Sequence, residues 1–216
     1  MKWLILQLAD SAFPTGGFAH SAGLEAAWQL GEVDDLGLFV DAALWQAGQQ
    51  ALPFVGGAYD DPARVAALDA ACNALLTNHV ANRASRTQGR AFAATCAKVW
   101  GTAALVDLDD ACRTRSLLAH VAPVFGAALR TLDVARNDAL ALYLHASLRG
   151  LASAAVRLGV TGPNEAQRLV SARAPTLDRV LETCEGLSWE DAAQPAPLID
   201  LFGAAQDRLY SRLFQS

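Results

Sequence analysis

The chain has 216 residues, a formal net charge of −5 and 53% hydrophobic residues. This length supports one sizeable core, and the negative charge argues against nucleic-acid binding, because phosphate-binding surfaces need clustered Lys and Arg. Alanine occurs 45 times while aromatic residues make up 7% of the chain, and this composition favours helices. We therefore expect an all-α protein, with about eight to ten helices packed as a single-domain bundle over residues 1–216.

The first ten residues, MKWLILQLAD, hold an apolar run that Gln7 and Asp10 interrupt. Such a run is too short for a signal peptide or a membrane span, so we expect a cytoplasmic protein without membrane contacts. Residues 6–25 read LQLADSAFPTGGFAHSAGLE. Pro14, Gly16 and Gly17 predict a shaped loop there, since proline removes a donor and glycine adopts conformations closed to other residues. Loops on rigid scaffolds are where contacts with other molecules concentrate.

Hydrophobic periodicity predicts helices along the rest of the chain. The first should run from Phe18 to a glycine C-cap at Gly31, and a break is expected at Pro53 and the pair Gly56-Gly57. A cluster at 107–110 should separate two helices, and Pro123 should bend or break the next one. The expected helices cover residues 18–31, 35–50, 63–79, 85–100, 115–132, 135–160, 164–174, 176–185 and 198–214, with 135–160 as the central core helix and a polar connector over 188–197.

Catalytic motifs are absent from the sequence. It lacks a P-loop, a G-x-S-x-G and an H-E-x-x-H, so we expect neither nucleotide hydrolysis nor hydrolase chemistry. The acidic pairs, such as Asp109-Asp110, do not continue into the D-D-x-x-D pattern that holds magnesium in helical prenyl-diphosphate enzymes, and helix starts account for them.

The candidate metal ligands are scattered. His79, His120 and His145 are expected to be structural, whereas His20 lies in the loop and is either a ligand or a satisfied loop residue. Cys72, Cys96, Cys112 and Cys184 show no C-x-x-C spacing and are expected to be buried thiols. We therefore expect no cofactor and no metal site in this chain.

The C-terminal residues 208–216, RLYSRLFQS, are unusually rich in Arg, aromatic and aliphatic side chains. These types dominate the energetics of protein interfaces. The tail is therefore a candidate recognition element, although docking on its own domain would also explain an apolar stripe.

Five segments in order carry a family resemblance: residues 6–25, NRASRTQGRAF at 82–92, HVAPVFG at 120–126, AAVRLGVTGPNEAQ at 154–167 and LYSRLFQS at 209–216. Together they resemble the urease accessory protein UreF over the full length. Where many members of that family read GGFSYS, this chain has His20. Where the tail often ends RLFRS, this chain has Gln215, which weakens any argument that needs a doubly charged terminus.

The resemblance implies an all-helical, non-catalytic and usually dimeric protein. Such proteins join UreD (also called UreH) and the nickel-carrying GTPase UreG on apo-urease, so nickel is handled by the complex rather than bound tightly here. With it we predict two interaction elements, the N-terminal loop at 6–25 and the C-terminal tail at 198–216. The residues predicted to bind partners are Pro14, Gly16, Gly17, Phe18, His20, Ser21, Glu25, Tyr210, Arg212, Leu213 and Phe214.

Two other functions stay open from the sequence. The protein could activate the GTPase by offering an arginine in trans, either Arg212 or one of the group Arg83, Arg86 and Arg90. Alternatively it could carry nickel through His20, although one imidazole supplies few ligands.

Overall fold

A computed structural model describes residues 2–216 of the chain as an assembly of helices. Eleven α-helices and four short 3₁₀ turns cover the described residues, and no strand occurs among them. The predicted fold class is therefore confirmed. The helices are α1 (Lys2–Ala9), α2 (Leu24–Gln29), α3 (Leu36–Asp60), α4 (Val65–Leu75), α5 (His79–Trp100), α6 (Ala103–Arg113), α7 (Val121–Thr131), α8 (Arg136–Arg157), α9 (Pro163–Ala172), α10 (Ala174–Cys184) and α11 (Pro197–Ala205).

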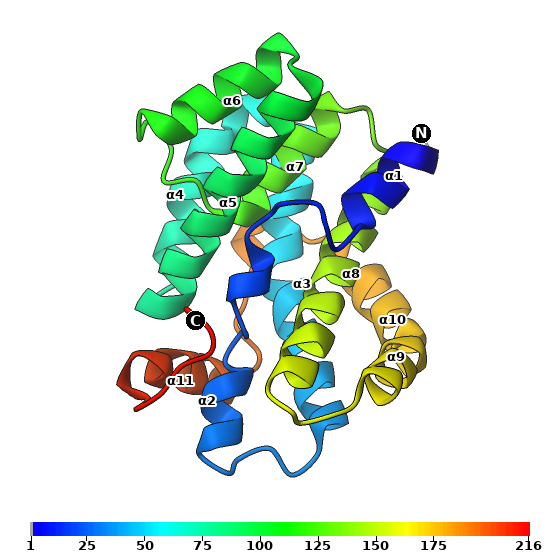
Figure 1. The fold of residues 1–216 in the computed structure, drawn as a ribbon. Helices are drawn as coiled ribbons and strands as arrows, with labels where there is room; N and C mark the ends of the chain where they lie inside the picture. Colours follow the sequence, from blue (N-terminus) through cyan, green and yellow to red (C-terminus); the bar gives the residue numbers. More distant parts are fainter. Residues whose placement is uncertain (1) are drawn as a thin grey trace.

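The long helices α3 and α8 run through the middle of the molecule (Figure 1). Helices α4 to α7 pack on one side of this pair, α9 and α10 on the other, and α2 and α11 close one end. Two clusters of buried side chains form the core. The larger one contains Phe54, Phe92 and Leu129, and the smaller one contains Leu44, Leu148 and Phe214.

Helix α8 is the central helix that the periodicity predicts at 135–160. Its 22 residues are long and apolar enough to cross a membrane, but half of the most apolar window is buried inside the bundle. Burial against α3, α9 and α10 accounts for this apolar composition. The four cysteines are free and buried, as predicted, and burial raises the pKa values of the Cys72, Cys96 and Cys112 thiols to about 12.

The break predicted at Pro53 is wrong, because α3 continues without interruption to Asp60. A proline inside a helix leaves the carbonyl four residues earlier without its donor. Here the N–H of Ala193, in the connector after α10, donates to the freed Gln49 carbonyl at 3.1 Å. A distant segment therefore compensates the lost bond and keeps the helix intact. The glycines at 56–57 belong to this helix as well, not to a turn.

Two further predicted boundaries are wrong for local reasons. The acidic residues at 107–110 lie within α6, and the stretch 114–120 is not helical. Pro123 occupies the first turn of α7, where a missing N–H removes no helical bond, so it begins a helix and does not kink one. Helix α5 also begins earlier than expected, because the Asn78 side chain accepts from the Val80 and Ala81 amides at 3.0 and 3.3 Å.

The loop at 114–120 is fixed by a buried carboxylate. Asp69 of α4 accepts hydrogen bonds from the backbone amides of Leu118, Ala119 and His120 at 2.5, 3.1 and 2.7 Å. Gly89 of α5 meets this loop closely, since a Cβ there would overlap the Ala119 carbonyl. The close-packing role predicted for Gly89 is therefore confirmed.

The two chain ends also differ from the prediction. After α1 the chain runs irregularly to a 3₁₀ turn at Gly17–Ala19, and the next α-helix begins at Leu24 rather than Phe18. Gly31 follows it with a φ of 75°, as expected for a glycine C-cap. The last helix ends at Ala205 with a 3₁₀ turn at Gln206–Arg208, so residues 209–216 are not helical.

Candidate partner-binding site at the paired chain ends

The N-terminal loop (residues 10–23) and the C-terminal tail (residues 209–216) lie side by side in the fold, and the C-terminus ends beside the N-terminal segment (Figure 1). The Ser21 amide donates to the Ser216 carbonyl at 2.5 Å, and the Gln215 amide donates to the Ala19 carbonyl at 2.8 Å. The two predicted interaction elements therefore form one continuous structure.

Glu25 fastens the tail to α2. This side chain is 1% exposed, and its carboxylate accepts from the Leu213 and Phe214 amides at 2.5 and 3.0 Å. The Gln206 side-chain amide donates to the same carboxylate at 2.5 Å. A buried carboxylate is stable only when its oxygens are well paired, so the tail and Glu25 depend on each other.

His20 connects the same two segments. Its Nδ1 lies 2.6 Å from the Ser216 hydroxyl, and the pKa of the ring falls below its usual 6.5 because the ring is desolvated and faces Arg83. No group of three His, Cys, Asp or Glu side chains within residues 2–216 is arranged to hold a metal ion. The geometry makes His20 a structural link between loop and tail.

Arg157 of α8 joins the two aromatic residues of the site. Its guanidinium carbon lies 3.8 Å from the centre of the Phe18 ring and 4.1 Å from that of Phe214, and it donates a hydrogen bond to the Phe18 carbonyl. Cation–π contacts of this kind fix ring orientation. Sequence reasoning missed Arg157, because within a core-helix pattern nothing marks an arginine that reaches both ends of the chain.

The predicted residues divide into a buried group and an exposed group. Ser21, Glu25 and Phe214 are buried and hold the loop and tail together. Phe18 is 70% exposed although its ring rests on Arg157, and Tyr210 and Leu213 are also exposed. Arg212 lies in the tail and not on a helix, with its side chain 45% exposed. The buried residues thus shape a surface on which the exposed ones can be contacted.

The remaining predicted residues shape the loop. Gly16 has a φ of 74°, which favours glycine, and the turn at Gly17 follows it. The Pro14 carbonyl accepts a hydrogen bond from the Thr95 hydroxyl of α5 at 3.0 Å. These contacts hold the loop against the bundle before it reaches Phe18.

Asp207, which sequence reasoning also missed, collects cations at the edge of the tail. Arg83 of α5 donates to both of its oxygens, with the shortest distance 2.9 Å, and Arg212 reaches it at 3.2 Å and His79 at 3.1 Å. The hydrogen bond from Arg83 is the main reason that the pKa of this carboxyl lies below its usual value. The tail is thus tied to α5 as well as to α2.

A cavity of about 450 Å³ lies beneath the N-terminal loop, between α3, α5 and α8. Its wall is mainly apolar and includes Phe92, Phe125 and Tyr143. The Gln50 side-chain amide nitrogen and Arg149 Nη1 also belong to lining residues, and both are buried without a hydrogen-bond partner within residues 2–216. The loop therefore covers an interior space that is not purely hydrophobic.

Together these features define a class of protein, an all-helical scaffold whose candidate site combines exposed aromatic and arginine side chains, the types that dominate protein interfaces. Comparison with known proteins identifies the family. A sequence profile described as UreF matches residues 30–174.

Individual relatives extend the match to the whole chain. Urease accessory protein F of Arabidopsis thaliana is 35% identical over an alignment that covers 100% of this chain and 93% of the plant protein. The japonica rice protein of the same name is also 35% identical, with 98% and 84% covered. Urease accessory protein UreF of Paenarthrobacter aurescens is 30% identical, with 97% and 96% covered. The chain belongs to the UreF family of urease accessory proteins, which take part in urease maturation and are non-catalytic.

Proposed function

We propose that this protein is a scaffold that assembles with UreD (UreH) and the GTPase UreG on apo-urease and controls the delivery of nickel. It acts in the cytoplasm, and nickel is cargo of the complex rather than a ligand of this chain. The supporting observation is the paired-end surface, where Phe18, Tyr210 and Arg212 are exposed on a backbone held by Glu25 and Arg157.

The test compares partner capture with folding stability. Replacing Phe18 or Arg212 with Ala should weaken binding to purified UreD or UreG by about 2 kcal/mol or more, as central interface anchors do. The melting temperature should change little, because neither side chain is buried. Leu38→Ala is the matched control, since Leu38 is equally exposed but lies at the start of α3.

Two results would reject the scaffold proposal for this surface. One is unimpaired capture by both variants, and the other is a loss of capture that merely follows a loss of stability. A core phenylalanine replaced by Ala would cost about 3 to 5 kcal/mol of folding free energy, and the exposed Phe18 ring should cost far less.

The proposal includes a homodimer. Leu198 and Leu201 of α11 are 64% and 65% exposed and lie three residues apart on one helix. Exposed apolar side chains that cluster in this way often mark contact surfaces. Light scattering should report a dimer at micromolar concentration, and a monomer throughout that range would remove this element of the proposal.

A second candidate is a regulator that stimulates GTP hydrolysis by UreG. The exposed Arg212 favours it, because its guanidinium makes a single hydrogen bond, to Asp207, and could turn outward. Among the other arginines considered, Arg83 is engaged by both oxygens of Asp207. An arginine finger should accelerate GTP turnover by about 10³-fold or more, and Arg212→Lys should abolish that gain. Equal turnover with and without this protein would leave the scaffold role alone.

A further inference from the structure

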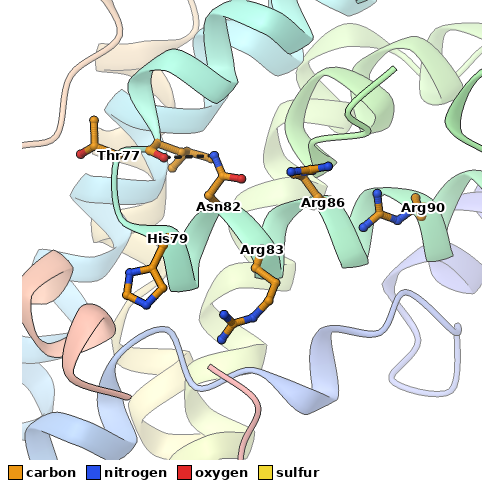
Figure 2. Close-up of a pocket in the computed structure, with 7 residues that line it drawn as sticks. Thr77, His79, Asn82, Arg83, Arg86 and Arg90 are labelled. Atoms are coloured by element: carbon orange, nitrogen blue, oxygen red, sulfur yellow. Dashed lines mark hydrogen bonds between the residues drawn. The ribbon is translucent and has the colours of Figure 1, made fainter. Parts of the chain in front are cut away.

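A basic groove lies along α5, outside the paired-end surface. Its lining contains His79, Arg83, Arg86 and Arg90, completed by Leu76, Thr77 and Asn82. Figure 2 shows the four cationic side chains following one another along the helix. The groove is open, has a volume of about 500 Å³, and contains no carboxylate among these lining residues. We call it the α5 groove.

One end of the α5 groove already holds a carboxylate. Arg83 binds Asp207 of the chain's own C-terminal segment through two nitrogens, and His79 lies on the same carboxylate. This forked pairing matches the geometry of guanidinium and carboxylate. The same helix face is therefore suited to carboxylates, and only its first part has one.

The second part of the α5 groove presents two arginines that pair with no carboxylate of the described chain. Arg86 donates from Nε to the Leu118 carbonyl at 3.2 Å, and Arg90 donates from Nη1 to the same carbonyl at 3.4 Å. A guanidinium has five N–H donors, so most of each fork stays available. Both side chains are half-buried, which limits the alternatives for those donors.

The position of these two arginines is set from behind. Leu118 belongs to the loop that Asp69 holds through three backbone amides. Asp69 is itself buried and spends its oxygens on those amides, so it fixes the Leu118 carbonyl without forming an ion pair with Arg86 or Arg90. The forks are thus oriented by the fold before any partner arrives.

We propose that the α5 groove binds an acidic segment of a protein partner, whose carboxylates pair with Arg86 and Arg90 beside Asp207. This inference deepens the proposed scaffold function and rests on it. Residues 79–90 span roughly 17 Å of helix, which an extended peptide of about five residues would cover. A short segment with two acidic residues is therefore sufficient.

A nucleic acid fits the site less well. The groove is short, and the chain as a whole carries a net charge of −5, which repels a long phosphate backbone. The carboxylate held by Arg83 is the one anionic group seen on this helix face.

The test uses purified UreD and UreG as binding partners. The double variant Arg86→Gln/Arg90→Gln removes both charges but leaves an amide that can donate to the Leu118 carbonyl. It should bind the partner at least tenfold more weakly, and the salt dependence of binding should become shallower. Arg113→Gln on α6 is the matched control, because Arg113 is exposed and pairs only with its helical neighbour Asp110. It should stay within twofold of the wild type.

Two additional measurements protect the result against misfolding and against another ligand. Arg86→Lys/Arg90→Lys keeps the charge and loses the fork, so it should fall between the wild type and the glutamine variant. Hexaglutamate should compete with the partner for the intact protein, while hexalysine should not. Stronger competition by tripolyphosphate than by hexaglutamate at equal charge would overturn the acidic-peptide assignment.

The outcomes separate this inference from the proposed function. If the wild-type protein binds its partners and the double glutamine variant binds equally well, the groove inference is wrong and the scaffold function stands. If the wild type binds neither partner, the scaffold function fails. Direct titration of the chain with fluorescent hexaglutamate then decides the inference, because a groove without affinity for it would be refuted.

Discussion

Replacing Glu25 with Gln should release the C-terminal tail while leaving the bundle folded. The carboxylate accepts two backbone amides of the tail and the Gln206 amide. A glutamine amide keeps one oxygen and turns an NH₂ group toward at least one of these donors. A hydrogen bond to a charged group contributes about 1.5 to 3 kcal/mol, and an unpaired donor adds to its loss. We therefore expect tail docking to weaken by about 3 kcal/mol.

Hydrogen exchange of the peptide that covers residues 209–216 measures this change. A loss of about 3 kcal/mol raises the open population on the order of 100-fold, and exchange of these amides should accelerate accordingly. Glu32→Gln, an exposed substitution just beyond the same helix, is the control and should leave tail exchange unaltered. Tail exchange within twofold of the wild type in Glu25→Gln would refute the view that this carboxylate holds the tail.

Three further outcomes follow from the structure. Gly89→Ala should lower stability by about 1 to 3 kcal/mol because its methyl group overlaps the Ala119 carbonyl, whereas Gly150→Ala, with open space around it, should raise stability by about 0.5 to 1 kcal/mol; thermal unfolding of both variants checks the contrast. His120 has its pKa lowered from 6.5 to about 4, mainly by burial, so the unfolded chain binds the proton first and stability should fall by about 2 kcal/mol between pH 7.5 and 5; denaturant titrations that give equal stability at both values would contradict this. The purified protein should show no GTP hydrolysis of its own, and turnover that co-elutes with it through successive columns would contradict its family assignment.

Sequence patterns predicted the parts of the fold that depend on local order. The apolar period of 135–160 identified α8, and the surroundings of the cysteines identified buried thiols. The loop around Gly16 and Gly17 was also predictable, because glycine and proline restrict or free the backbone by themselves. In each case the decisive information lies within one or two helical turns.

The errors arise where a distant segment supplies the missing interaction. Pro53 reads as a helix end until Ala193 is known to donate to the Gln49 carbonyl. Glu25 looks like an exposed first-turn acid, yet the tail covers it with two amides almost 190 positions later. The same holds for the helix predicted to start at Phe18, whose backbone pairs with the tail instead.

The candidate site was only partly predictable for the same reason. Exposed aromatic residues near a glycine turn are visible in a sequence, so Phe18 could be chosen. Arg157 and Asp207 could not, because each acts on a segment far from its own helix. Whether the chosen residues bind partners stays a prediction.

The pairing of the two chain ends imposes an order on folding during synthesis. The loop near Ser21 leaves the ribosome first, and its hydrogen-bonding partner Ser216 lies 195 positions later. At the usual rates of translation, roughly 10 to 40 s separate the two events. Throughout that interval the Glu25 carboxylate lacks the amides that later cover it, and its helix cannot reach its final state. The bundle must therefore form around an unfinished end, and the last residues to be made complete the structure begun by the first.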